Sequence, residues 1–193
     1  MSLTSRPAEL TLPVAALTAL RRELVAELGE DRAAEILEEA GRAAGDVLVT
    51  LVEAALPAGS VNASGDALEA DRLAAAPASA FWNTLTRLLA ARGWGHLTFE
   101  SAHPGLGSLD SIDLAESDAA APALRPSCHF TAGMLAHVLG NVARETVAVL
   151  EVECRARGDL RCRFLFGGAP ALEAVHAGLV AGQPLEATLE AMA

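Results

Sequence analysis

Apolar residues in the first half of the chain recur with the 3.6-residue period of amphipathic α-helices. The first stripe consists of Leu17, Leu20, Leu24 and Leu28. Gly29 follows this stripe as a stop signal, and a longer periodic stretch then covers residues 31–56. The glutamates of that stretch lie mostly off its apolar stripe, so they are interpreted as a solvated face rather than as a carboxylate site.

Turn-forming residues separate this region from the next helix. Pro, Gly, Ser and Asn dominate residues 57–65, which predicts a loop, and a weak helical patch follows. Pro77 and Ser79 then introduce a stronger helix, which Gly93 and Gly95 end.

After that helix the period changes from helical to strand-like. Alternating residues predict strands at 96–100 and 111–114, joined by a turn-rich connection at 103–107. A helix is predicted over 131–139, with Gly140 as its stop signal.

The last third of the chain predicts a β-hairpin and a helical tail. Strands are expected at 146–155 and 161–166, joined by a tight turn at 157–159, with helix again from Pro170 onward. The whole order predicts an α+β fold, in which N-terminal helices are followed by an antiparallel sheet packed with helices.

The sequence contains no internal repeat and no linker, which predicts a single domain over residues 1–193. Its mainly helical part is expected at 1–95, its sheet part at 96–168 and its C-terminal helices at 169–193. A chain of 193 residues is long enough to bury a core of its own.

Composition argues against a membrane protein. The hydrophobic content is 52% and the mean hydropathy is +0.32, but much of both values comes from alanine. No apolar run approaches the roughly 20 residues that span a bilayer. Residues 1–10 also lack the basic-then-apolar order of a secretory signal, so we expect a cytoplasmic protein.

Charge narrows the range of partners. The net charge is −11, and all 14 basic residues are arginine. Such an acidic chain repels phosphate backbones and anionic lipids, which argues against nucleic-acid and membrane binding, with one local basic exception at 155–163. Because lysine and tyrosine are absent, Schiff-base chemistry, a P-loop lysine and a tyrosine acid–base group are excluded.

The three cysteines are the main candidates for chemistry. If the hairpin loop has three residues, Cys154 and Cys162 lie directly opposite each other across the two strands. Strand alternation then places them on one face together with Leu150, Val152, Phe164 and Phe166. Cys128 directly precedes a predicted helix, whose N-terminus favours a thiolate.

Three thiolates and a nearby carboxylate are a suitable ligand set for tetrahedral zinc. Glu151, three residues before Cys154, points to the opposite face of a regular strand, so its participation requires a β-bulge or a strand end near Glu151. The same spacing also fits ordinary buried cysteines or a cross-strand disulfide, and the residues alone leave these three interpretations open.

The segments Cys128-His-Phe-Thr-Ala-Gly-Met-Leu135 and Glu151-Val-Glu-Cys-Arg-Ala-Arg-Gly-Asp-Leu-Arg-Cys-Arg-Phe164 resemble the 4-vinyl reductase domain family. Their pattern is a Cys, then Glu-x-x-Cys, seven residues, and Cys. That family includes the sensor domains of phenol- and xylene-responsive bacterial activators and a bacteriochlorophyll-synthesis protein. It is related in fold to small subunits of the transport-particle complexes that tether vesicles.

The resemblance implies a zinc site. In the phenol-sensing members these four positions hold zinc, and they correspond to Cys128, Glu151, Cys154 and Cys162. Four protein ligands leave no place for an activated water, so the implied role is structural. The chain departs from the family pattern at His137, where many members have a small residue, and this puts the ligand class in doubt.

The resemblance also implies a ligand cavity, because aromatic and histidine side chains line one in the sensor members. Phe81, Trp82 and His103 are the candidates here, although two aromatic residues on a helix are also typical of core packing. No catalytic arrangement is evident. The serines lack a nucleophile-elbow context, and the acidic residues between 110 and 118, Glu116 included, are interpreted as a solvated strand edge.

We therefore expect non-catalytic binding of a small hydrophobic or aromatic molecule, as in the sensor members, together with a structural zinc ion. A homodimer is expected, with the Val- and Leu-rich second helix as its surface. The alternatives are a protein–protein scaffold, like the vesicle-tethering subunits, and an accessory role in tetrapyrrole vinyl reduction.

Overall fold

The computed structural model describes residues 9, 11–56, 72–118 and 122–192, so the predicted loop at 57–65 lies outside the described residues. The helices and strands are α1 Val14–Leu28, α2 Glu30–Ala55, α3 Arg72–Ala75, α4 Ala78–Ala91, β1 Thr98–His103, β2 Leu106–Ser111, α5 His129–Ala143, β3 Ala148–Glu153, the short 3₁₀ turn η1 Arg155–Arg157, β4 Cys162–Gly167, α6 Ala169–Val180 and α7 Leu185–Glu190.

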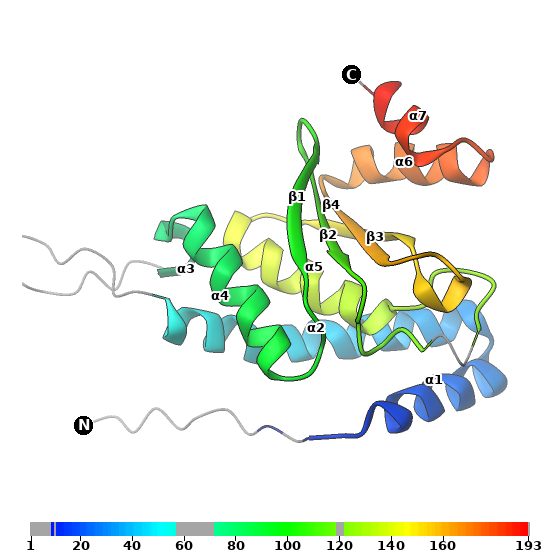
Figure 1. Cartoon of the computed structure of the whole chain (residues 1–193), viewed down its shortest axis with the longest axis horizontal. Coiled ribbons are helices and arrows are strands. Elements are labelled where there is room, and N and C mark those ends of the chain that lie inside the picture. Colours follow the sequence, from blue (N-terminus) through cyan, green and yellow to red (C-terminus); the bar gives the residue numbers. More distant parts are fainter. Residues whose placement is uncertain (1–8, 10, 57–71, 119–121, 193) are drawn as a thin grey trace, which may run out of the picture.

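The four strands form one antiparallel sheet in the order β1-β2-β4-β3. The helices α2 and α5 run side by side along one face of the sheet, and α6 with α7 lies over the other face (Figure 1). The predicted α+β fold is therefore confirmed. The division of the chain into three parts within one domain stays a prediction.

Two apolar cores hold the layers together. The larger core lies between the sheet and the helices α2, α4 and α5, and its most deeply buried members include Leu85, Leu109, Leu135, Val138 and Phe164. The smaller core lies under α6, and it is formed by Leu106, Val152, Leu165, Leu172, Val175 and Leu185. In contrast, no residue of α1 is fully buried.

The strand predicted at 111–114 is wrong. Gly105, at φ 87°, closes a tight turn after β1, so the second strand already begins at Leu106. It ends at Ser111, whose hydroxyl donates a hydrogen bond to the Asp113 carboxylate (3.1 Å) and bends the chain out of the sheet.

The helix predicted over 131–139 is longer at both ends. α5 begins at His129 and continues through Gly140 to Ala143. A glycine inside a helix costs only about 1 kcal/mol relative to alanine, so favourable packing on both sides of Gly140 outweighs it. The helix ends where Arg144 adopts the left-handed conformation, at φ 56°.

The helices α2 and α5 approach each other at positions that have no side chains. A Cβ atom added to Gly133 would overlap the Glu38 backbone carbonyl, and one added to Gly41 would overlap the Phe130 carbonyl. The close approach is thus possible only with glycine at both positions. It fixes α5 in the space between α2 and the sheet.

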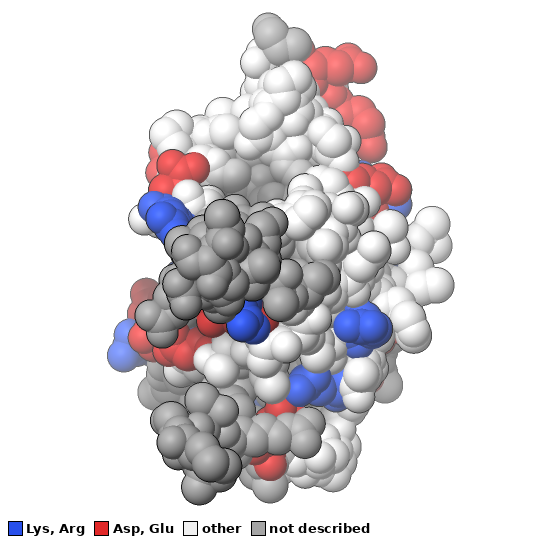
Figure 2. Space-filling view, turned by 90° about the vertical axis from the view of Figure 1, so that its left-hand side faces the viewer, with Lys and Arg blue, Asp and Glu red and all other residues white. Residues whose placement is uncertain are grey.

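The surface shows no feature of a membrane protein or a polyanion-binding protein in the part that the structure describes. None of the described helices combines the length and the apolar content needed to cross a bilayer. On the face in Figure 2, arginine and acidic side chains lie scattered among uncharged surface.

Gly133→Ala is expected to destabilise the fold by roughly 1–3 kcal/mol, because its new methyl group can be accommodated only if two backbones separate. Chemical denaturation measures this loss. Gly168→Ala is the matched control, since a Cβ there approaches only the Pro170 ring, at 3.9 Å, and the expected change is a few tenths of a kcal/mol. Equal losses in the two variants would contradict the role of this crossing.

Candidate metal centre and ligand cavity

A β-bulge in the C-terminal hairpin brings a glutamate to the cysteine side of the sheet. Glu151 pairs with Phe164 and Glu153 pairs with Arg163, so β3 has one residue more than β4 in this stretch. Because of the extra residue, Glu151 and Cys154 share a face although they are three positions apart. The sequence required this bulge for a four-residue site, and the structure contains it.

The same bulge corrects the predicted face of β3. Leu150 and Val152 lie not with the cysteines but under α6, in the smaller core. Glu153 points to that outer side as well, where it forms ion pairs with Arg161 (2.8 Å) and Arg163 (3.4 Å).

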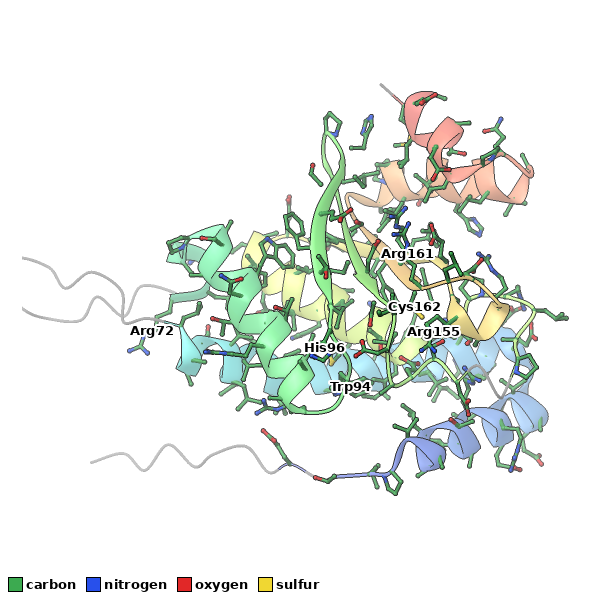
Figure 3. The ribbon with its side chains drawn as sticks, viewed as in Figure 1. Arg72, Trp94, His96, Arg155, Arg161 and Cys162 are labelled. Atoms are coloured by element: carbon green, nitrogen blue, oxygen red, sulfur yellow. The ribbon has the colours of Figure 1, made fainter. Side chains whose placement is uncertain are left out.

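The three cysteines and Glu151 come together in the interior. Cys128 is the N-cap residue of α5, and its Sγ lies 3.8 Å from the Sγ of Cys154 and 3.9 Å from that of Cys162. Candidate ligand atoms of all four residues lie within 4.8 Å of one another. Figure 3 shows Cys162 at the start of β4, in the middle of the molecule.

These distances fit a tetrahedral metal ion. Sulfur atoms about 2.3 Å from a central zinc ion lie about 3.8 Å from one another. The three cysteines are at most 1% exposed and Glu151 is 9% exposed, so water does not compete for the position between them.

The Glu151 carboxylate is oriented for coordination. Its Oε2 accepts a hydrogen bond from the Cys128 backbone N–H, at 2.9 Å. Its Oε1 is buried and has no hydrogen-bond partner among the described residues. A buried carboxylate oxygen without a partner is costly, and a cation held by the three sulfur atoms would satisfy it.

The cluster retains protons when no cation is bound. Burial, together with the nearby Cys154 sulfur, raises the pKa of Glu151 to about 8. Hydrogen bonds from Cys128 and Cys162 lower the pKa of Cys154, and the hydrogen bond to Cys154 raises that of Cys128. A divalent cation would replace the protons and offset the charge of several buried anions.

Sequence analysis missed Glu116, which is not on a solvated edge. Its side chain is 4% exposed and lies at the N-terminus of α5. Its carboxylate accepts hydrogen bonds from the backbone N–H groups of Phe130 (2.9 Å) and Thr131 (2.7 Å) and from the Thr131 hydroxyl (2.6 Å). No local signal reveals this cap, because it comes from a loop residue 14 positions away.

Phe81, Trp82 and His103 line one cavity of about 520 Å³. The cavity lies between α4, the β1–β2 hairpin and the C-terminal half of α5. The Trp82 ring is stacked on that of Phe99, with 4.3 Å between ring centroids and 7° between ring planes. Phe81 is also a core residue, with 3% exposure, so both of the roles considered for it in the sequence apply.

His103 contributes an unpartnered nitrogen to this cavity. Its Nδ1 lies 2.9 Å from the Pro104 carbonyl oxygen, which only accepts hydrogen bonds, so Nδ1 carries the proton. In the neutral imidazole the other nitrogen, Nε2, is then an acceptor. This Nε2 is buried and has no partner among the described residues.

His137 does not enter this cavity. Its ring packs against Gly45 of α2, and its Nε2 lies 2.8 Å from an Asp46 carboxylate oxygen. The larger side chain at this position therefore fills space between α2 and α5, and it does not narrow the aromatic cavity.

A second cavity of about 610 Å³ lies on the other side of the molecule, between α1, α2 and the loop before α5. Cys128 and Glu151 border it, as do Arg21, Glu38 and His176. No Phe or Trp ring lies among the described residues of its lining, and its charged walls are less suited to an apolar ligand.

Residues 115–167 match the sequence model of the 4-vinyl reductase domain. This range contains all four clustered residues, and the match confirms the resemblance to that family. No curated protein sequence matches the chain.

Among solved structures, the chain is similar to the phenol-responsive sensory domain of the transcription activator PoxR with phenol, at TM-score 0.66 and 23% identity over 91% of this chain and 84% of that one. It is also similar to a vinyl-4-reductase family protein from Methanocaldococcus jannaschii, at TM-score 0.51 and 15% identity over 82% of each chain. These similarities show a shared fold. None of them involves a vesicle-tethering subunit, so that relation stays a prediction.

Burial of Glu116 predicts a pH-dependent stability, because burial raises its pKa from 4.5 to about 7 against the effect of its hydrogen bonds. The native state then favours the protonated group, whose contribution is complete below about pH 4.5 and is lost as the pH rises through 7. Between pH 5 and 8 the wild type should therefore lose roughly 2 kcal/mol more stability than Glu116→Gln. Urea unfolding in excess zinc measures both slopes, and identical slopes would contradict a buried titrating Glu116.

Proposed function

We propose that this chain, whose residues 115–167 match the 4-vinyl reductase domain, binds a small aromatic molecule without chemical conversion and is held together by a structural zinc ion. The observation that carries the proposal is the buried acceptor of His103, which faces a cavity whose walls include Phe81 and Trp82.

The cavity indicates the chemistry of its ligand. Its lining is mainly apolar and aromatic, and no Asp, Glu, Lys or Arg side chain lies among the described lining residues. An uncharged ligand with an aromatic ring is therefore favoured. Because His103 Nε2 accepts hydrogen bonds, the ligand should carry an O–H or N–H donor, and a phenol meets both requirements. The similar sensory domain of PoxR is phenol-responsive and was solved with phenol, which supports this choice.

The zinc ion would have a structural role. Cys128, Glu151, Cys154 and Cys162 fill all four positions of a tetrahedral ion, so no position remains for substrate or water. The ion would join the N-terminus of α5 to both strands of the hairpin, and its binding free energy would then contribute to folding.

The homodimer and the cytoplasmic location belong to the same proposal. The structure does not favour α2 as the dimer surface, because Leu48 and Val52 of that helix are buried in the core. Exposed apolar residues lie on and before α1 instead, with Leu12 63% and Leu20 53% exposed.

Protein purified without a metal-affinity tag is expected to contain about one zinc ion per chain, since the four ligands form one closed site. Glu151→Ala should weaken zinc binding by more than about 100-fold, which exceeds the usual effect of losing an outer-shell partner. Glu153→Ala is the matched control, because this neighbouring carboxylate lies on the other face of the strand. Elemental analysis and native mass spectrometry measure the metal, and the same spectra report the dimer and any co-purified ligand.

Two results would contradict the zinc site. One is a wild-type protein with no metal and three titratable thiols. The other is an equal loss of zinc in the Glu151 and Glu153 variants, because coordination through the bulge predicts that only the former matters.

Phenol is expected to bind at least about tenfold more tightly than anisole, which has the same ring but no donor and would leave His103 Nε2 unpaired. Calorimetric titration measures both affinities. In His103→Phe the preference for phenol should disappear. His176→Phe is the control, because His176 borders the other cavity.

Equal affinities of the wild type for phenol and anisole would contradict the role of His103. Loss of phenol binding in His176→Phe but not in His103→Phe would place the ligand in the cavity next to the metal centre instead.

A further inference from the structure

The Phe166 ring lies directly over a glycine of the neighbouring strand. Phe166 of β4 pairs with Gly107 of β2, and both residues border the aromatic cavity. A Cβ atom added to Gly107 would be closer than van der Waals contact to three atoms of the Phe166 ring. The ring therefore occupies space that any other residue at position 107 would take.

Neighbouring rings hold Phe166 from the other side. Its ring centroid lies 5.6 Å from that of Trp82 and 6.1 Å from that of Phe99, and the planes are tilted by 43° and 38°. These distances are within the range of favourable aromatic pairs. The ring is thus fixed between the glycine backbone and the Trp82 side of the cavity.

Phe166 covers a stretch of the sheet that otherwise has no side chains facing the cavity. Where β2 and β4 border the cavity, the other lining residues are Gly105, Gly107, Gly167 and Leu106. Leu106 is 3% exposed and belongs to the smaller core under α6, on the opposite side of the sheet. Without the Phe166 ring, this wall of the cavity would be glycine backbone.

We propose that Phe166, held in place by Gly107, is the residue that determines how large an aromatic ligand the cavity accepts. This inference rests on the proposed function and adds the specificity of the same site. The ring limits the depth of the cavity toward the sheet. The donor of the ligand remains anchored at His103, so a ligand with a second fused ring has to extend into the space that Phe166 occupies.

Two substitutions are expected to change specificity in opposite directions. Phe166→Ala exposes the glycine wall and deepens the cavity. Gly107→Ala forces the Phe166 ring away from β2 toward Trp82, which makes the cavity shallower. A residue with only a structural role would weaken the binding of small and large ligands alike.

The experiment measures dissociation constants of phenol and 2-naphthol for zinc-loaded wild type, Phe166→Ala and Gly107→Ala. The affinity for 2-naphthol relative to phenol should rise about tenfold or more in Phe166→Ala and fall about tenfold or more in Gly107→Ala. Phe164→Leu is the control, because this buried residue of the same strand does not border the cavity, and its ratio should equal that of the wild type. If Phe166→Ala does not fold, Phe166→Leu should shift the ratio in the same direction by a smaller factor.

The outcomes separate this inference from the proposed function. If all variants bind both ligands with the wild-type ratio, the role of Phe166 is overturned, while aromatic binding stands. If the wild type binds neither ligand, the proposed function is overturned, and the role of Phe166 with it.

Discussion

The N-terminus of α5 is the point on which the rest of the structure depends. Its first N–H groups have no partners within the helix, and two buried carboxylates accept them: Glu151 bonds Cys128, and Glu116 bonds Phe130 and Thr131. One carboxylate comes from the sheet and the other from the loop before the helix. The helix end is thereby tied to both, and Cys128 is placed against the other two cysteines.

Burying so many ionisable groups in one place is costly unless their charge is offset. Two carboxylates and three thiols lie within the larger core or at its edge, and burial raises the pKa of both Glu116 and Glu151. The partial positive charge of the helix N-terminus favours these anions only modestly. A divalent cation among the sulfur atoms would remove most of the remaining cost, which is why the cluster is better explained as a metal centre than as three ordinary buried cysteines.

The metal centre and the aromatic cavity share their supporting elements. α5 contributes Cys128 at its start and Leu139 and Val142 to the cavity near its end. β4 likewise begins with Cys162 and carries Phe166 four residues later. The spacing between α5 and the sheet is therefore fixed at one end by polar contacts and candidate metal ligands. At the other end it leaves a cavity bordered by apolar side chains.

Periodicity and motif spacing are sufficient to identify most of the secondary structure and the candidate ligands. Helical and strand periods depend on local burial, so most elements, the hairpin and the four-residue motif are evident without coordinates. The strand at 111–114 failed because side-chain hydrogen bonds and a glycine turn, rather than hydrophobic alternation, decide where β2 lies. Glu151 was named from the family pattern, but its own position in the strand argued against it.

Contacts between distant elements determine which of these residues meet. The β-bulge that turns Glu151 inward follows from pairing with β4, and the cap formed by Glu116 joins residues 14 positions apart. The unpartnered nitrogen of His103 and the position of Phe166 over Gly107 likewise depend on such contacts. A sequence pattern reports the preference of each residue for burial or solvent. It does not report which partners packing leaves to a buried polar atom, and the proposed chemistry of this protein rests on such atoms.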